Sequence, residues 1–503
     1  MNVMPDGTPI RRVLVVAYVF PPAGGAGVQR VTKFVKYLPE FGWDCSVLTV
    51  ANPSVPVFDE TLAKDVPEST VVRLAKTLEP GYALKNAVSA GSGGARSAKQ
   101  SGGLKKLIKS TVRAACNAIL QPDAQILWYP GAVKEGLQLL SELKHDAIFV
   151  TAPPFSSFVT GAAISRKSGL PLIVDYRDEW GISNQFQENR QKSNFSHRLQ
   201  DRMQRKVLRQ ASAVIATTGR SAESVGEAVK RAGSSATVSC IYNGYDAADF
   251  SKVSSDSVND VTTAGEASDS TLEDVDQPIG RKLRIAYVGT LWNLTSIEPV
   301  ISAIEKLAAK DSDKAERIEL VVAGRRTGAQ DEILDRLEAL PCSLIREGYV
   351  EHERAIEIMN QADVQCLLLS DVPEAGRVVP AKTFEYLALG RKILYIGPAG
   401  EVSEILSDFP QAESVIPADV DGIAEYFSWQ LDESEANSAK VNTAEPNTAE
   451  ANTAEANTAS AERFERRSLT RQLAKILNQA CGGTAEPMAL PVDAGFEVAE
   501  ATA

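Results

Sequence analysis

The chain has 503 residues, of which 44% are hydrophobic, and its formal net charge at pH 7 is −12. This length and composition predict about two to four domain-sized units with packed cores. No apolar run reaches the roughly 18 residues that a spanning helix needs, and the first one ends at Pro21 and Pro22, so we expect an unsecreted cytoplasmic protein.

The charge distribution and the cysteines indicate which partners and cofactors the protein uses. Residues 1–250 carry a balance of +9 and the rest of the chain −21. Part of the acidity lies in the Ser/Thr/Asp-rich stretch 251–277, which we interpret as solvated. The six cysteines are scattered without a C-x-x-C pair, which predicts reduced thiols and no metal site. We expect no cofactor and no nucleic-acid partner.

The first predicted element is a strand, a glycine loop and a helix. The apolar run 13–19 predicts the strand, Gly24, Gly25 and Gly27 follow it, and apolar residues recur at helical spacing over 31–38. Glycines here let the backbone approach a ligand, and the helix N-terminus offers N–H groups to an anion or a sugar hydroxyl. The spacing is not G-x-G-x-x-G, which favours a phosphate-bearing or sugar ligand over a nicotinamide cofactor. A loop that only turns the chain is the alternative.

A basic amphipathic stretch lies at residues 104–115. Its apolar residues fall on one helical face, with Lys105, Lys106 and Lys109 beside them. This pattern predicts either a helix that lies on an anionic membrane or a core-facing helix with solvated lysines. The sequence leaves both interpretations open.

Apolar runs and amphipathic stretches alternate over the rest of the first half. This alternation predicts a parallel sheet wound with helices, in which ligands bind at the carboxyl ends of the strands. We expect the helices at about 155–167 and 196–210, and the strands at 147–152, 171–176, 213–218 and 238–242.

The segment that ends the 171–176 strand is rich in functional groups. It contains Asp175, Arg177, Asp178, Glu179 and Trp180. Carboxylates, an arginine and aromatic rings suit the binding of sugar hydroxyls and of a sugar ring face. The alternative is an Asp-capped turn with an arginine salt bridge.

A second alternation starts at residue 283, after the acidic insert 251–281, and predicts a second α/β domain over 282–432. Its clearest ligand site is the loop and short helix 378–390, where a first helical turn and Lys382 would bind a diphosphate and Glu385 would accept from ribose hydroxyls. A solvated lysine and a helix-start carboxylate are the alternative. The predicted donor-side residues are Gly289, Thr290, Arg325, Tyr349, Val350, Val379, Lys382, Thr383 and Glu385.

The C-terminal part begins with a repeat and ends in a polar tail. Residues 433–460 contain variants of Asn-Thr-Ala-Glu and too little apolar surface to fold, which predicts a linker. Helical apolar spacing resumes over 461–481, and we expect that helix to dock on a domain. Residues 482–503 are predicted to be disordered.

Taken together, these segments resemble the GT-B nucleotide-sugar glycosyltransferases of the large group 1 family, with a glycosyltransferase-4-like N-terminal domain. The similarity covers nearly all of 11–250 and 283–430. The segments that carry it are Phe20-Pro21-Pro22 with the glycine loop and Val28-Gln29-Arg30, Tyr37-Leu38-Pro39 with Gly42-Trp43, Asp175 to Trp180, Asn243-Gly244-Tyr245-Asp246, and Phe384-Glu385-Tyr386-Leu387-Ala388-Leu389-Gly390.

The resemblance implies two Rossmann-like, doubly wound domains that face each other across a cleft. Residues 1–250 would hold the acceptor, 282–432 would hold the nucleotide sugar, and the helix 461–481 would cross back to the first domain. Transfer would need no metal. The acceptor- or sugar-side loop would consist of Gly24, Gly25, Gly27, Gln29 and Arg30.

The sequence departs from the family pattern at two places. Many members carry two glutamates separated by seven residues, but the position that far before Glu385 is Arg377. The arginine and lysine that often hold the diphosphate are Thr290 and Thr295 here. Lys382, Arg325 or Arg377 would have to replace them.

No general base is evident from the sequence. We interpret the three histidines, His145, His197 and His352, as surface residues. In a retaining transfer the leaving phosphate can take the acceptor proton, so the protein supplies positioning and charge stabilisation. We predict Asp178 as the group that orients the acceptor hydroxyl, with Arg177 and Asp175 completing the catalytic set.

The sequence thus predicts a retaining, metal-independent glycosyltransferase. Its acceptor would be a saccharide or a lipid-linked molecule, and its setting cell-envelope or exopolysaccharide synthesis, possibilities that the resemblance alone supplies. Two alternatives are a GT-B fold epimerase that acts on a nucleotide sugar and a catalytically inactive protein that binds a sugar or a partner.

Overall fold

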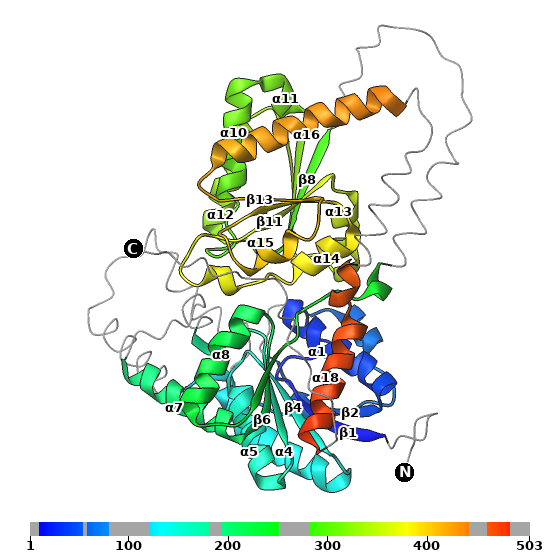
Figure 1. Ribbon diagram of the computed structural model, residues 1–503, viewed down its shortest axis with the longest axis vertical. Coiled ribbons are helices and arrows are strands. Elements are labelled where there is room, and N and C mark those ends of the chain that lie inside the picture. Colours follow the sequence, from blue (N-terminus) through cyan, green and yellow to red (C-terminus); the bar gives the residue numbers. More distant parts are fainter. Residues whose placement is uncertain are drawn as a thin grey trace, which may run out of the picture.

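The structure, a computed structural model, describes residues 10–53, 58–79, 120–181, 194–250, 282–441 and 460–482. Two parallel sheets, each flanked by helices, lie one above the other, with the N-terminal sheet in the lower half of Figure 1. Each half is a doubly wound, Rossmann-like domain, which confirms the predicted α/β class. The stretch 104–115, the insert 251–281 and residues 483–503 lie outside the described residues.

The N-terminal sheet has seven parallel strands in the order β3-β2-β1-β4-β5-β6-β7. Its central strands are mostly apolar because helices cover both faces of a parallel sheet. The strands are β1 (Arg11–Val16), β2 (Trp43–Val50), β3 (Val71–Ala75), β4 (Ala147–Ala152), β5 (Leu172–Tyr176), β6 (Ala211–Ala216) and β7 (Thr237–Cys240). The helices are α1 (Ala26–Tyr37), α4 (Tyr129–Glu142), α5 (Ser156–Ser168), α7 (Asn194–Gln210) and α8 (Gly219–Ala232), with short 3-10 helices η1 (Leu38–Phe41), η2 (Glu60–Asp65), η3 (Ala124–Trp128) and η4 (Ala247–Asp249).

The C-terminal sheet has six parallel strands in the order β10-β9-β8-β11-β12-β13. The strands are β8 (Leu283–Val288), β9 (Ile318–Ala323), β10 (Ser343–Glu347), β11 (Val364–Leu368), β12 (Lys392–Ile396) and β13 (Ala412–Val415). The helices are α10 (Glu298–Lys310), α11 (Ser312–Glu316), α12 (Gly328–Asp335), α13 (His352–Gln361), α14 (Lys382–Leu389), α15 (Glu401–Leu406) and α16 (Val420–Val441), with 3-10 helices η5 (Arg336–Ala339) and η6 (Ala375–Arg377).

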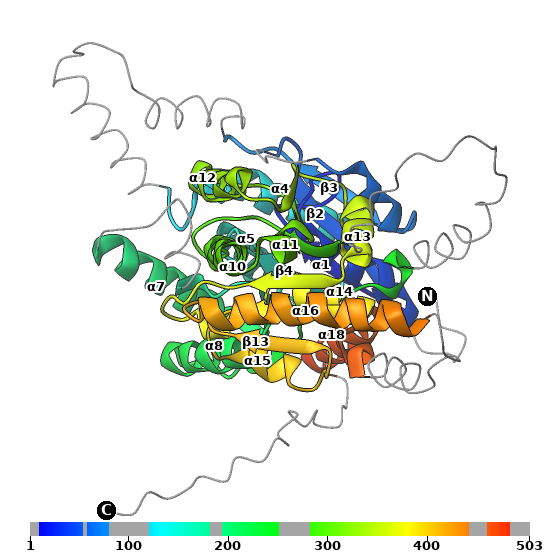
Figure 2. The same ribbon diagram turned by 90° about the horizontal axis from the view of Figure 1, so that it is seen from above.

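Helix α16 extends past the predicted end of the second domain. We placed the end of the second domain at residue 432, but the helix continues to Val441. The residues that follow 432 are rich in glutamate and alanine, which have high helix propensity, so they extend the helix before the repeat begins. The views of Figures 1 and 2 show α16 crossing the C-terminal domain, and α7 extending outward from the side of the N-terminal domain.

A helix from the end of the chain completes the N-terminal domain. Helix α18 (Arg466–Ala480), which follows the 3-10 helix η7 (Glu462–Phe464), lies beside α1 in Figure 1. Its buried residues Leu469, Leu473 and Leu477 join the same apolar cluster as Val13 on β1. The chain therefore passes between the domains twice, once after η4 and once before α18.

The two domains are also in direct contact at the start of α8. Glu401 of α15, 4% exposed, accepts hydrogen bonds from the backbone N–H groups of Gly219 and Arg220, the latter at 2.9 Å. The hydroxyl of Tyr242 donates to the same carboxylate at 2.9 Å. A side chain of one domain thus caps a helix of the other.

Among the described residues, no helix combines the length and the apolar character that crossing a membrane requires.

We expect Gly244→Ala to destabilise the junction between α18 and the first domain. Gly244 has a φ of +66°, and a Cβ there would lie 2.2 Å from the carbonyl oxygen of Phe464. Gly233, with the same φ of +66°, has no atom within 4 Å of an added Cβ. Gly244→Ala should lower the free energy of unfolding by about 3 kcal/mol and Gly233→Ala by about 1 kcal/mol, measured by urea denaturation. Equal losses would show that the contact with Phe464 adds nothing.

Candidate functional site

A pocket of about 420 Å³ lies between the two domains. Its volume falls in the range of sites that enclose a small organic ligand. The N-terminal domain contributes Gly24, Gly25, Gln29, Asp59 and Leu62. The C-terminal domain contributes Tyr287, Val288, Gly289, Thr290, Trp292, Thr295, Ala323, Gly324, Arg325, Tyr349, Val350, His352, Ala355, Leu367, Leu368, Pro380, Ala381, Lys382, Glu385 and Tyr386.

The glycine loop forms the N-terminal wall of this pocket. Gly25 is the residue before α1 and has a φ of +107°, a conformation that side-chain-bearing residues rarely adopt. Gly24 and Gly25 both line the pocket. The loop therefore presents backbone rather than side chains to the space between the domains.

The start of α14 forms the opposite wall. Lys382 and Glu385 both line the pocket, and their side chains are paired at 2.5 Å. Glu385 is 5% exposed, and burial alone would raise its pKa. The charge of Lys382 outweighs that effect, so the pKa of Glu385 lies below its usual value and the carboxylate is ionised at neutral pH.

The remaining cation at the pocket is Arg325. It follows β9, is exposed, lines the pocket and makes no ion pair with any residue that the structure describes. Arg377, our other candidate for the missing diphosphate cation, does not line the pocket. Its guanidinium pairs with Glu374 at 2.6 Å and with Glu179 at 3.4 Å, because it lies at the contact between the domains.

Seven of the nine predicted donor-side residues line the pocket, and two do not. Val379 is 6% exposed and packs in the apolar core of the second domain, and Thr383 is 0% exposed. Both precede or begin α14, and their side chains are buried, so they do not offer side-chain contacts to a ligand in the pocket.

Asp175 and Arg30 form a buried ion pair and are not open to a substrate. Asp175 is 0% exposed and Arg30 1% exposed. The Arg30 guanidinium donates to the two carboxylate oxygens of Asp175 at 2.8 and 3.2 Å, and Thr151 donates to Asp175 at 2.8 Å. The predicted roles of Asp175 in catalysis and of Arg30 in a sugar-side loop are therefore wrong, because the pair joins α1 to β5.

Arg177 and Trp180 are also used within the protein. Arg177 donates to the backbone carbonyls of Gly27 and Pro153. Trp180 is 3% exposed and its ring stacks on Phe155 with 4.7 Å between the centroids. The segment thus anchors the glycine loop and the core instead of presenting an arginine and an aromatic face to a sugar.

The two remaining acidic residues of the segment have different surroundings. Glu179 accepts from the hydroxyls of Ser221 at 2.9 Å and Ser224 at 2.7 Å, both in α8. Asp178 is exposed at the carboxyl end of β5, although it is not among the residues that line the pocket. Although part of the side chain reaches solvent, neighbouring protein atoms displace water around the carboxylate and raise the pKa of Asp178, and the charge of Arg177 partly opposes the rise.

Two of the three histidines are not surface residues, which corrects that interpretation. His352 begins α13, lines the pocket, and places Nδ1 3.0 Å from Nε2 of Gln29 and Nε2 3.1 Å from a carboxylate oxygen of Asp249. His145 is 5% exposed, with Nδ1 2.7 Å from the carbonyl oxygen of Leu143. His197 is exposed, as predicted.

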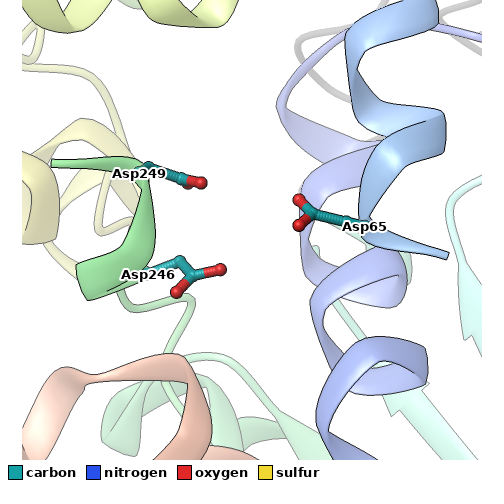
Figure 3. Close-up of side chains that lie close together, drawn as sticks. All are labelled: Asp65, Asp246 and Asp249. Atoms are coloured by element: carbon teal, nitrogen blue, oxygen red, sulfur yellow. The ribbon is translucent and has the colours of Figure 1, made fainter. Parts of the chain in front are cut away.

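Three carboxylates near α1 form a cluster that resembles a metal site in composition. Asp65 of η2 faces Asp246 and Asp249 of the η4 segment (Figure 3). Two ammonium groups already lie among them. Lys33 is within 2.7 Å of all three carboxylates, and Lys36 is 2.8 Å from Asp65 and from Asp246. We interpret the cluster as an ion-pair network that holds η2 and η4 on α1.

Comparison with known proteins assigns the class. Residues 24–240 match the family described as glycosyl transferase 4-like domain. The first domain is therefore a glycosyltransferase domain. No curated protein matches its sequence.

Solved structures share the two-domain fold of this glycosyltransferase at low sequence identity. HepE of Anabaena, in complex with UDP, has a TM-score of 0.53 and 14% identity over 93% of this chain and 100% of its own. An α,α-trehalose-phosphate synthase (UDP-forming) of Burkholderia xenovorans, in complex with glucose-6-phosphate, has a TM-score of 0.57 and 12% identity over 93% of this chain and 100% of its own. A candidate UDP-N-acetylglucosamine 2-epimerase of Listeria monocytogenes has a TM-score of 0.50 and 12% identity over 96% of this chain and 100% of its own. Identities this low show the fold alone.

Sequence reasoning missed two polar residues of the glycosyltransferase pocket. Asp59 lies before η2, in a region for which we made no prediction. His352 follows Tyr349 and Val350, which we did select, so its nearness in sequence was the available signal. Neither residue follows a strand directly, so neither fits the strand-end pattern on which the site prediction rests.

We expect Asp246→Asn to weaken the dependence of the free energy of unfolding on pH in acid. Burial would raise the pKa of Asp246, but Lys33, Lys36 and Tyr37 lower it well below the usual range. The stabilisation that Asp246 gives the folded state is therefore complete above the unfolded pKa of about 3.9, and it is lost as the pH falls toward the lower pKa of the folded state. The variant should lose about 3 kcal/mol at pH 7 and show a shallower decline between about pH 5 and 2, by urea denaturation.

The matched control is Asp44→Asn. Asp44 pairs with Arg12 at 2.9 Å, but its side chain is 28% exposed. A surface pair of this kind contributes about 0–1 kcal/mol, so the control should change little at any pH. Parallel profiles for the wild type and Asp246→Asn would contradict the assignment.

Proposed function

We propose that the pocket binds a nucleoside-diphosphate sugar and that the enzyme transfers the sugar, with retention and without a metal ion, to an acceptor on the N-terminal domain. The observation that carries this proposal is the shape of the site: a glycine loop on one wall, and on the other a helix start with the ionised Glu385. The UDP complex of HepE, which has the same fold, supports a nucleotide as the ligand.

The pocket residues suggest how a donor would lie. Glu385 is an ionised acceptor suited to ribose hydroxyls, and Arg325 is the cation with free charge for the diphosphate. Lys382 shares its charge with Glu385. Gly289 and Thr290 would line the phosphate side, and Tyr349 and Val350 the base side.

In the proposed reaction the bond between the anomeric carbon and the diphosphate oxygen breaks, and a bond from the same carbon to the acceptor oxygen forms. The acceptor proton passes to the departing diphosphate, which leaves on the same face of the sugar. Asp178 is our candidate for orienting the acceptor hydroxyl, because its carboxylate is exposed while Asp175 and Glu179 are already bound within the protein. Arg177 acts only by fixing the glycine loop and by its charge on Asp178.

The match of residues 24–240 to a glycosyltransferase family favours transfer over epimerisation. The candidate epimerase shares only its fold with this chain. A catalytically inactive binder remains the second candidate, favoured by Thr290 and Thr295 at positions where the family often has cations. A saccharide or lipid-linked acceptor and a role in envelope or exopolysaccharide synthesis are parts of the proposal that rest on the resemblance. A cytoplasmic location rests on the composition and the cysteine pattern, and membrane contact through 104–115 rests on the basic amphipathic pattern of that stretch.

We expect one family of nucleotide diphosphates to raise the melting temperature of the wild type. A ligand at about 100 times its Kd stabilises the folded state by about 2.7 kcal/mol. Glu385→Ala should remove most of this shift because it removes the acceptor for the ribose. The control Glu357→Ala, an exposed carboxylate of α13 paired with Arg354, should leave the shift unchanged. A full shift with Glu385→Ala would contradict the donor assignment.

Asp178→Asn should reduce turnover more than it reduces donor binding. The substitution keeps the shape of the side chain but removes the charge that orients the acceptor hydroxyl. A loss of about 100-fold in kcat, with the Kd for the nucleotide within about twofold, is the expected result in a transfer or donor-hydrolysis assay. An unchanged kcat would exclude Asp178 from the mechanism.

A further inference from the structure

His352 connects three parts of the molecule at the edge of the pocket. It belongs to α13 of the C-terminal domain, and its Nδ1 lies 3.0 Å from Nε2 of Gln29, which belongs to α1 of the N-terminal domain. Its Nε2 lies 3.1 Å from Oδ2 of Asp249, which belongs to the segment that leads out of the first domain. One imidazole therefore makes a polar contact with each of these parts.

These contacts fix the orientation of the ring. The amide nitrogen of Gln29 can only donate, so Nδ1 accepts, and Nε2 then carries the hydrogen that it donates to Asp249. Asp249 is itself held by Lys33 at 2.6 Å, and Lys33 is 2% exposed. Both ring nitrogens are thus occupied by the protein, which argues against proton transfer by His352 and for a role in holding other groups in place.

The bridge lies where the two walls of the pocket meet. Gln29 and His352 both line the pocket, as do Gly24 and Gly25 in the loop just before α1. Gln29 follows Gly25 by about one helical turn, so a contact that holds Gln29 also holds the start of α1 and its loop.

We propose that His352 is a positioning residue whose hydrogen bond to Gln29 holds the glycine loop against the donor wall, so that a nucleotide diphosphate meets both walls of the pocket at once. This inference rests on the proposed function, because it takes the pocket as the donor site. Binding to a preorganised pocket avoids the cost of ordering the loop.

The first test measures the Kd for UDP and for GDP by calorimetry in single and double variants. His352→Ala and Gln29→Ala should each raise the Kd for whichever of the two nucleotides binds by about three- to tenfold, which is the effect of one hydrogen bond. The double variant should bind as the weaker single variant does, because both substitutions break the same bridge. His352→Asn, which keeps a polar acceptor on a short side chain, should recover part of the affinity.

The matched control is His197→Ala, which removes an exposed histidine of α7 that does not line the pocket. It should leave the Kd unchanged. Losses that multiply in the double variant, a loss in the control as large as in His352→Ala, or no recovery with His352→Asn would each overturn the inference.

A second measurement does not depend on any nucleotide. In ligand-free protein, amide hydrogen exchange over residues 24–31 and 349–356 should be faster in His352→Ala and in Gln29→Ala than in the wild type, at an unchanged melting temperature. Unchanged exchange in these segments would overturn the bridge. If exchange responds as expected but the wild type binds neither UDP nor GDP nor any other nucleotide diphosphate, the proposed function fails and the bridge stands.

Discussion

The buried ion pair between Arg30 and Asp175 is the constraint on which the site depends. Its two partners are 145 positions apart in the chain, and both side chains are 1% exposed. Arg30 also donates to the carbonyl oxygen of Tyr242 at 2.7 Å, so one guanidinium joins α1, β5 and the segment that leads toward the second domain. Removing either partner would leave an uncompensated buried charge, at a cost of about 3–5 kcal/mol. The position of the glycine loop follows from this pair, because the loop precedes the helix that Arg30 fixes.

The architecture was predictable from the sequence because a parallel sheet buries both faces of its strands. β4 and β5 are buried along their whole length and are mostly apolar, and the glycines that follow β1 mark the ligand-facing edge. β3 was not predicted. It is an edge strand of five residues, and its outward side chains Val72 and Leu74 are exposed, so it lacks the pattern of a central strand.

The site was predictable only in part, since composition does not reveal which partner a side chain has. Asp175, Arg177, Asp178 and Glu179 are adjacent in sequence and appear equivalent there, but three of them bind other parts of the protein and only Asp178 stays exposed. Each of the three has at least one partner more than 40 positions away in the sequence. His352 shows the same limit in reverse, because its partners Gln29 and Asp249 are too distant in sequence to mark it as a pocket residue.

The carboxylate of Glu401 gives one helix a dependence on the neighbouring domain. A helix start normally completes its hydrogen bonds with residues of its own segment or with water. At α8, the Thr218 hydroxyl accepts a hydrogen bond from the N–H of Ser221 within the segment. The N–H groups of Gly219 and Arg220 instead donate to Glu401 of the other domain. Separating the domains at this edge would return two amides and a 4%-exposed carboxylate to water together. The first turn of α8 is therefore part of the contact between the two domains, and its hydrogen bonding depends on that contact.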